Sequence, residues 1–199
     1  MFTIDRWEHM FYNIILNTIF TVISAILLKY ASYVIINCEY FSNLGDVKVY
    51  NFNIEPSQIK LFMNKLLIEN SFDDFELREC TIATKATFSI DGKFNKDWDE
   101  NENKVFCNWS EIRPLAFEII KGKQKPLYMK YVFAYSDEKA LTFHPNAKAC
   151  FVNIIFKNDV VTVSTGTAQI EFSMNHDLDQ VWDSFVSEFF KTLGITEVK

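Results

Sequence analysis

Segment 177–194 constrains the fold more than any other part of this sequence. Its apolar residues recur at alternating steps of three and one, the spacing of one broad helical face. That face comprises Leu178, Val181, Trp182, Phe185, Val186, Phe189, Phe190 and Leu193. Asp177 and Gln180 can form a capping box at its start, and Gly194 can close its end. Because so many aromatic rings need burial, we expect this helix to dock on a sheet.

Two further helices are predicted. One follows Pro56, which suits a first helical turn, and ends near Asn70. Its apolar stripe is Ile59, Phe62, Met63, Leu66 and Leu67. The other runs from Asn108 or Ser110 to Lys121, with Gly122 as a stop. Since proline inside a helix removes a hydrogen bond, we expect a separate turn over 109–113 and a helix opening at Pro114.

Alternating apolar residues predict the strands. The segments are 75–90, 127–135, 150–156 and 160–164. The parity of the first slips near Arg78 and Glu79, which predicts a bulge, and Asp91-Gly92 is a turn signal. Residues 157–159 join the last two segments, and Thr165-Gly166 predicts a turn into one more strand over 168–172.

These elements predict an α+β fold, a two-layer domain with a mainly antiparallel sheet and about three helices. Hairpin-like links between the late strands favour the antiparallel sheet with helices on one side. The domain is expected to span residues 49–199. A hydrophobic content of 49% with 23% charged residues suits a chain that buries a core.

A hydrophobic segment precedes this domain. Residues 10–28 carry no formal charge, and the apolar character resumes after Lys29 through Ile36. A helix of this length would span roughly 28 Å, close to the ~30 Å hydrocarbon core of a bilayer. We therefore expect residues 1–48 to be an extension with a hydrophobic helix, and residues 10–36 to be a candidate membrane segment.

Three interpretations of residues 1–48 stay open. The segment is a single-pass membrane anchor, a helix buried in the domain, or translated upstream DNA. The third rests on Gly45-Asp46-Val47-Lys48, which a purine-rich ribosome-binding sequence could encode, followed by a GTG start at Val49. Globular patterning begins only near Tyr50, so we expect the extension to be detachable.

The net charge limits which partners the protein can bind, and the cysteines indicate in which compartment it resides. The net charge of −6 argues against general binding to nucleic acids or anionic membranes. Cys38, Cys80, Cys107 and Cys150 form no CxxC pair and lack the dense spacing of a disulfide scaffold. We expect reduced thiols in a cytoplasmic protein, with anchoring through residues 10–36 as the alternative.

A basic concentration is the candidate ligand-binding site. Three lysines within five residues, with an arginine nearby, could hold a phosphate, and a segment of hydroxyl residues around Gly166 could bind an anion. The residues are Arg113, Lys121, Lys123, Lys125, Ser164, Thr165 and Thr167. The alternatives are a helix C-terminus favoured by positive charge and an ordinary hairpin turn.

No catalytic residue, metal site or cofactor is predicted. His144 and His176 have no partner at metal-ligand spacing, and no nucleophile with a general base can be assembled. The last helix should present an acidic outer face that a partner protein could use. This face comprises Asp177, Asp179, Asp183 and Glu188.

Several motifs resemble a known family. They are IKLFMNKLL at 59–67, TFSIDGK at 87–93, residues 109–126, STGT at 164–167 and LDQVWD at 178–183. Together they resemble an uncharacterised family of short proteins from anaerobic Firmicutes, classed as a domain of unknown function. The resemblance covers about residues 52–195 and implies a cytoplasmic bacterial protein, but no activity, cofactor or partner.

The sequence favours a non-enzymatic interaction or regulatory module. The alternative is a binding protein or enzyme for a phosphorylated or nucleotide ligand that uses the loop from Lys121 to Lys125. A further alternative is a membrane-tethered version of either. We expect a protein partner rather than nucleic acid.

Overall fold

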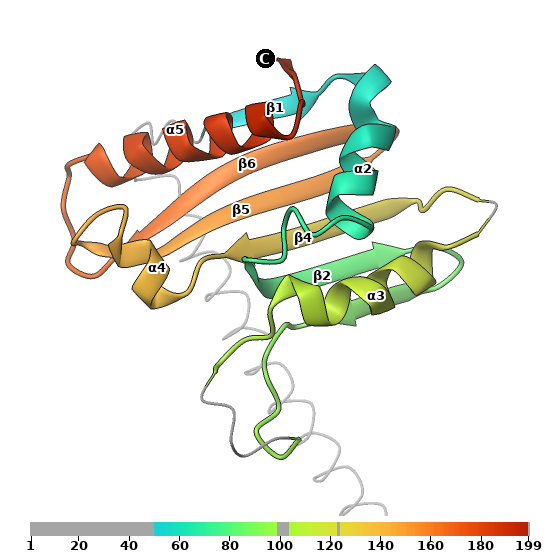
Figure 1. Cartoon of the computed structure of the whole chain (residues 1–199), viewed down its shortest axis with the longest axis horizontal. Coiled ribbons are helices and arrows are strands. Elements are labelled where there is room, and N and C mark those ends of the chain that lie inside the picture. Colours follow the sequence, from blue (N-terminus) through green and yellow to red (C-terminus); the bar gives the residue numbers. More distant parts are fainter. Residues whose placement is uncertain (1–49, 99–103, 123, 199) are drawn as a thin grey trace, which may run out of the picture. The chain divides into compact units, whose positions relative to one another are not determined.

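A computed structural model describes residues 50–98, 104–122 and 124–198 (Figure 1). These residues belong to the second of the two units into which the chain divides, Val49–Lys199. The predictions for residues 1–48 lie outside the described residues. Among the described helices, none has the length and apolar composition needed to cross a bilayer.

The core of the fold is a seven-stranded sheet in which every pairing is antiparallel. The spatial order is β3-β2-β4-β5-β6-β1-β7. The strands are β1 Asn51–Ile54, β2 Glu76–Ala83, β3 Thr87–Ile90, β4 Tyr128–Ala134, β5 Ala147–Lys157, β6 Val160–Gln169 and β7 Glu197–Val198. Two of them, β1 and β7, are additions to the predicted set.

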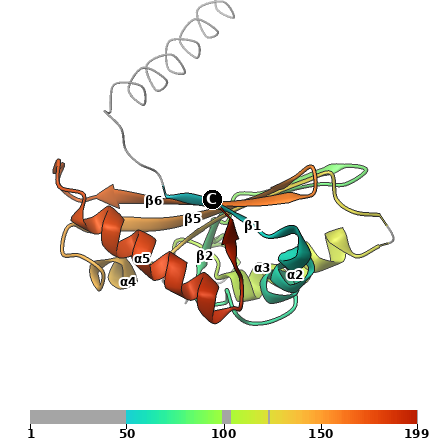
Figure 2. The ribbon, with the colours of Figure 1, turned by 90° about the horizontal axis from the view of Figure 1, so that it is seen from above.

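The described helices lie on one face of this sheet (Figure 2). They are the 3-10 helix η1 Pro56–Gln58 and the α-helices α2 Ile59–Leu67, α3 Trp109–Ile120, α4 Asp137–Leu141 and α5 Asp177–Thr192. The predicted two-layer α+β class is therefore confirmed. The described residues contain four α-helices rather than about three, because a short helix, α4, links β4 to β5.

Helix α5 docks on the sheet as its apolar stripe predicts. Leu178, Trp182, Val186 and Phe190 are buried, whereas Val181 is 42% exposed at the margin of the stripe. The predicted capping box is wrong, because Asp177 is itself the first helical residue and its N–H donates to Asn175 Oδ1 at 2.9 Å. The predicted stop is confirmed: Gly194 adopts φ +75 and its N–H donates to the carbonyl of Lys191.

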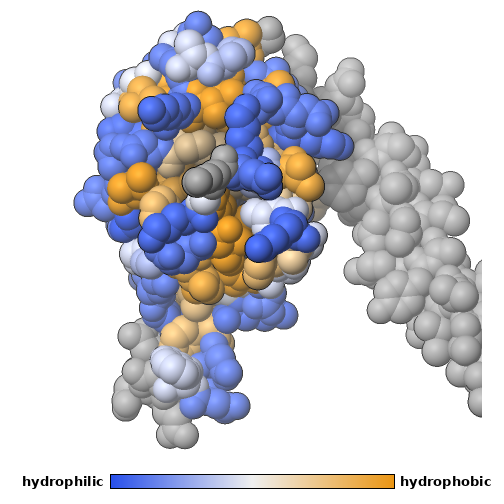
Figure 3. All heavy atoms as spheres, turned by 90° about the vertical axis from the view of Figure 1, so that its right-hand side faces the viewer, coloured by the Kyte–Doolittle hydropathy of each residue, from blue (hydrophilic) through white to orange (hydrophobic). Residues whose placement is uncertain are grey.

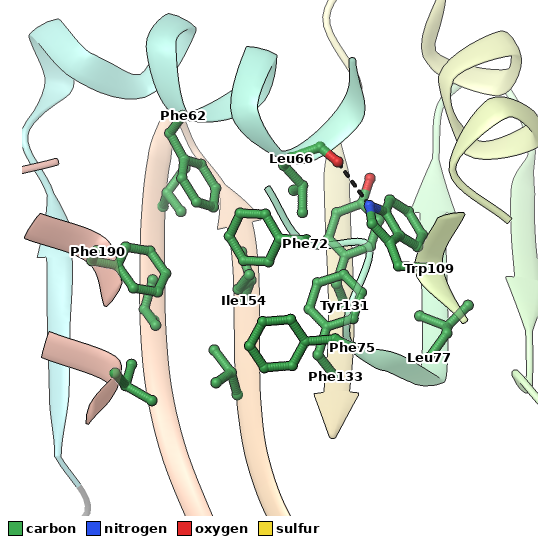
Figure 4. Packing of buried hydrophobic residues seen from close by; sticks show 14 of the residues in the cluster. Phe62, Leu66, Phe72, Phe75, Leu77, Trp109, Tyr131, Phe133, Ile154 and Phe190 are labelled. Atoms are coloured by element: carbon green, nitrogen blue, oxygen red, sulfur yellow. Dashed lines mark hydrogen bonds between the residues drawn. The ribbon is translucent and has the colours of Figure 1, made fainter. Parts of the chain in front are cut away.

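The core between the two layers is rich in aromatic rings (Figure 4). Phe190 of α5 meets Phe62 of α2 with ring centroids 5.8 Å apart, and Phe72 lies 5.7 Å from Phe133 of β4. The indole N–H of Trp109 donates to the carbonyl of Leu66 at 2.8 Å. Aromatic pairs in such stacked and tilted arrangements stabilise a core beyond the area that they bury.

Helix α3 begins before Pro114, so the predicted separate turn over 109–113 is wrong. Its start is held by Glu111, whose carboxylate accepts the backbone N–H of Asn108 at 2.8 Å. The first turn is also anchored by the buried indole of Trp109. These contacts offset the loss of the single backbone hydrogen bond that the proline removes.

The alternating segment 75–90 is a hairpin of β2 and β3 rather than one strand, with a tight turn over residues 84–86. The predicted bulge is confirmed, because the register between β2 and β4 shifts between Leu77 and Glu79. Gly92 adopts φ +69 in the predicted turn after β3. A Cβ there would lie 2.0 Å from the carbonyl oxygen of Leu77, so only glycine fits.

Strands β5 and β6 form the predicted hairpin, whose turn residues Asn158 and Asp159 both have positive φ. The predicted turn at Thr165-Gly166 and the separate strand over 168–172 are wrong, because β6 runs without a break from Val160 to Gln169. Gly166 pairs with Phe151 of β5, and this non-local pairing outweighs the local turn signal of the glycine.

Candidate functional site

The side chain of Arg113, the first of the predicted ligand-binding residues, is used inside the protein. Its guanidinium pairs with the carboxylate of Asp73 at 2.9 Å and also donates to the backbone carbonyl of Ile68. Both acceptors belong to the segment that follows α2. Arg113 therefore ties α3 to that segment, which is a structural role.

The lysines have separate acidic partners. Lys121 pairs with Glu118 one turn earlier in α3 at 3.1 Å, and Lys125 pairs with Asp159 in the β5–β6 turn at 2.8 Å. Lys123 lies outside the described residues. On the face that Figure 3 shows, apolar residues form separate patches between polar ones rather than one continuous area.

The hydroxyl residues 164–167 lie in strand β6 and meet helix α5. The hydroxyl of Thr165, which is only 5% exposed, donates to Asp183 at 2.5 Å, and Thr167 donates to Asp179. Ser164 lies opposite Asn51 of β1. None of the described contacts joins these hydroxyls to Arg113, Lys121 or Lys125. Ligand binding by this set stays a prediction.

The acidic outer face predicted for α5 is wrong for Asp179 and Asp183, because both carboxylates turn towards β6. Burial raises the pKa of Asp183; the hydrogen bond from Thr165 lowers the same pKa, and the charge of Asp179 raises it further. His176 Nδ1 lies 3.1 Å from Asp179 Oδ2. These groups form a polar seam that fixes the position of α5 on the sheet.

A further polar contact joins Tyr50, the residue before β1, to β7. The hydroxyl of Tyr50 donates to the carboxylate of Glu197 in β7. Burial, and then the hydrogen bond to Glu197, raise the pKa of Tyr50. This hydrogen bond joins the residue before β1 to β7.

A different feature stands out on the surface, the β6–α5 loop, residues 170–176. It presents Phe172 and Met174, which are 82% and 85% exposed, beside the exposed side chain of Ile170. Large apolar side chains gathered in this way on the surface of a domain are typical of interaction sites. The sequence prediction missed them, because it placed Phe172 at the end of a strand and assigned no role to Met174.

The β6–α5 loop is held in place by hydrogen bonds. The side-chain amide of Asn146 donates to the carbonyl of Glu171 at 2.7 Å and accepts the Glu171 N–H at 2.8 Å. Gln169 accepts the N–H of Ser173 at 2.8 Å, and Asn175 accepts the N–H of Asp177. The backbone that carries Phe172 and Met174 is thus ordered before any partner arrives. A sequence signal existed in the polar run Ser173, Asn175 and Asp177, which is typical of turns.

The comparison with family models matched residues 65–196 to DUF5721, a family of unknown function. The match spans most of the described domain, from α2 to the residue before β7. The chain belongs to the DUF5721 family. The predicted membership of a domain of unknown function is therefore confirmed. No curated protein and no solved structure matched.

The DUF5721 match includes the β6–α5 loop and the whole predicted ligand-binding set. Within the described residues of this DUF5721 chain, no group of three or more His, Cys, Asp and Glu side chains is placed to hold a metal ion. His144 and His176 each have a local role: His144 Nδ1 accepts the N–H of Asn146 at 3.1 Å, and His176 faces Asp179.

Proposed function

We propose that this DUF5721 protein is an interaction module that binds a protein partner through the β6–α5 loop. The observation that carries the proposal is the exposure of Phe172 and Met174 on backbone held by Asn146 and Gln169. Aromatic residues and methionine are enriched in protein interfaces. An ordered loop also loses little conformational entropy on binding, which favours affinity.

The charges around the β6–α5 loop indicate what kind of surface a partner would present. No lysine or arginine occurs between Lys157 and Lys191, whereas Glu171 and Asp177 flank the exposed apolar side chains. A partner with an apolar pocket and a basic rim fits this surface. Nucleic acids and anionic lipids are disfavoured, because their phosphates would meet like charge.

The experiment compares variants of the loop with a matched control. The double substitution Phe172→Ser and Met174→Ser removes the apolar side chains, and Leu127→Ser removes a similarly exposed one before β4. Each full-length form is purified from its native cells, and the bound proteins are quantified by mass spectrometry. We expect at least one partner to be lost with the loop variant and kept with Leu127→Ser. Equal sets of bound proteins would contradict the proposal.

We propose cytoplasmic residence, which is supported by the state of the cysteines. Cys80, Cys107 and Cys150 are free thiols, and burial raises the pKa of Cys80 and of Cys150 to about 12. Free thiols of this kind suit a reducing compartment. The alternative is anchoring through residues 10–36. Cell fractionation tests both: recovery in the membrane fraction, together with a peptide from residues 1–40, would overturn the cytoplasmic proposal.

A further inference from the structure

Within the described residues, no strand pairs with the outer edge of β3. Strand β3 stands at one end of the order, and Thr87, Phe88 and Ser89 are exposed. The opposite edge strand, β7, has only two residues. The β2–β3 register is regular, and β3 contains neither proline nor a charged residue. Natural proteins use bulges, prolines and charged residues on edge strands to prevent edge-to-edge pairing, and β3 has none of the three.

The direction of the free backbone groups follows from the hairpin. The N–H of Thr84 donates to the carbonyl of Ala86, and the same register pairs Ile82 with Phe88 and Cys80 with Ile90. Hydrogen-bonded and non-hydrogen-bonded pairs alternate along an antiparallel ladder. The even-numbered residues of β3 therefore bond to β2. The N–H and carbonyl groups of Thr87 and Ser89 point outward, where no strand of the described ranges pairs with them.

We propose that β3 pairs with β3 of a second copy of this chain, antiparallel and centred on Phe88, so that the two sheets become one. A two-fold axis brings the same patch of both copies together, so the patch must be complementary to itself. The centre at Phe88 places Thr87 opposite the partner's Ser89, and both residues have outward backbone groups. Two hydrogen-bonded pairs, each exchanging two bonds, close the interface.

Charge complementarity selects this register. Lys85 and Asp91 lie three residues before and three after Phe88, both exposed and without an ion-pair partner among the described residues. Centring on Phe88 brings each Lys85, at the tip of the β2–β3 turn, to the end of the partner's β3 where Asp91 lies, on both sides of the axis. Opposite charges brought close in this way attract each other.

The other registers that keep outward groups opposite each other are less favourable. Centring on Ser89 would bring Lys85 towards the partner's Lys93, beyond the turn at Gly92, and the two like charges would repel each other. Centring on Thr87 would place Lys85 opposite Ser89 and leave Asp91 without a cation. Any centre between two residues would pair outward groups with inward ones and form no ladder.

Phe88 adds an apolar contact at the axis. It lies opposite Ile82 and is 42% exposed, although Ile82 itself is fully buried beneath the helices. In the dimer, Phe88 faces its symmetry mate in a non-hydrogen-bonded pair, the kind in which side chains approach most closely. Aromatic cross-strand pairs are among the most stabilising.

Site-specific cross-linking tests the pairing in the full-length chain. Cα atoms of a non-hydrogen-bonded pair lie about 4.5 Å apart, within the range that a disulfide bridges. We expect Phe88→Cys, oxidised with copper phenanthroline, to give a disulfide-linked dimer on a non-reducing gel. Thr87→Cys is the matched control, because its symmetry mate lies diagonally at about 7–8 Å, and it should link at least several-fold less. No dimer with Phe88→Cys, or equal dimer with both, would overturn the proposal.

Two further variants probe the backbone and the charges. Adding Ser89→Pro removes an outward N–H that β2 does not use, so the cross-link at position 88 should disappear while the circular dichroism spectrum stays unchanged. Lys85→Glu or Asp91→Lys, each combined with Phe88→Cys, should reduce the cross-link. Mixing these two proteins should restore it as a mixed dimer, because both ion pairs can form there, one in the original order and one reversed. A cross-link that survives Ser89→Pro, or a mixture that links no better than its components, would overturn the proposal.

Discussion

The indole N–H of Trp109 donates a hydrogen bond of 2.8 Å to the backbone carbonyl of Leu66, inside the core. The bond joins the first residue of α3 to the last turn of α2. It therefore sets the spacing of two helices whose packing against the sheet is otherwise non-directional.

Replacing the indole tests this bond. Trp109→Phe keeps an aromatic ring but leaves the carbonyl of Leu66 without its donor in a buried place. We expect the free energy of unfolding to fall by about 2–4 kcal/mol, because an unsatisfied buried acceptor adds to the cost of a smaller ring. Urea unfolding followed by circular dichroism measures the change. A loss below about 0.5 kcal/mol would show that the bond contributes nothing.

A second prediction concerns the turn after β3. Gly92→Ala would place a Cβ 2.0 Å from the carbonyl oxygen of Leu77 at a residue with φ +69. We expect a loss of at least about 1–3 kcal/mol in the free energy of unfolding, the usual cost of a strained backbone position. Gly166→Ala is the control, because nothing lies within 4 Å of its Cβ, and it should be neutral or stabilise by about 0.5–1 kcal/mol. Equal effects of the two substitutions would contradict the prediction.

The helix α5 shows what a local pattern can predict. Its apolar residues follow a helical period over the whole segment, so both its existence and its buried face could be inferred without knowing the rest of the fold. The bulge near Arg78 was likewise visible as a break in alternation. The sequence predicts too early an end for strand β6, because Thr165-Gly166 resembles a turn locally. The pairing of this segment with β5 depends on residues elsewhere in the chain.

The predicted site shows the limit of such reasoning. A cluster of basic residues in the sequence suggests a phosphate site, but the partners of Arg113 and Lys125 are Asp73 and Asp159, which are distant in sequence. Asn146, which holds the β6–α5 loop, is likewise 25 residues before Glu171, the residue that it bonds. These contacts depend on the topology of the sheet, so the spacing of neighbouring residues in the sequence cannot predict them.

A third prediction separates the structural role of Arg113 from that of an exposed lysine. Arg113→Ala leaves the half-buried carboxylate of Asp73 without its cation, so we expect a loss of about 1–3 kcal/mol in the free energy of unfolding. Lys125→Ala breaks an ion pair on the exposed surface and should change the free energy of unfolding by less than about 0.5 kcal/mol. Denaturant titrations of both variants provide the comparison. Equal stability of the two would refute a structural role for Arg113.

The last prediction concerns pH and the seam beneath α5. Burial raises the pKa of Asp183 above its ordinary value, so the folded protein holds this proton more tightly than the unfolded chain. The resulting stabilisation is fully present below the unfolded pKa and is lost as the pH rises through the folded pKa. Asp183→Asn keeps an oxygen that can accept from Thr165 and removes the charge.

We therefore expect Asp183→Asn to be at least as stable as the unmodified chain at about pH 7, where burial of the charged carboxylate is costly. The advantage should shrink towards about pH 4, where the carboxyl group takes up its proton. Urea unfolding of both proteins across this range measures the difference. Glu188→Gln, on the exposed side of the same helix, is the control and should show no such trend. If the advantage of Asp183→Asn grew as the pH fell, the pKa of Asp183 would be lowered rather than raised in the folded protein.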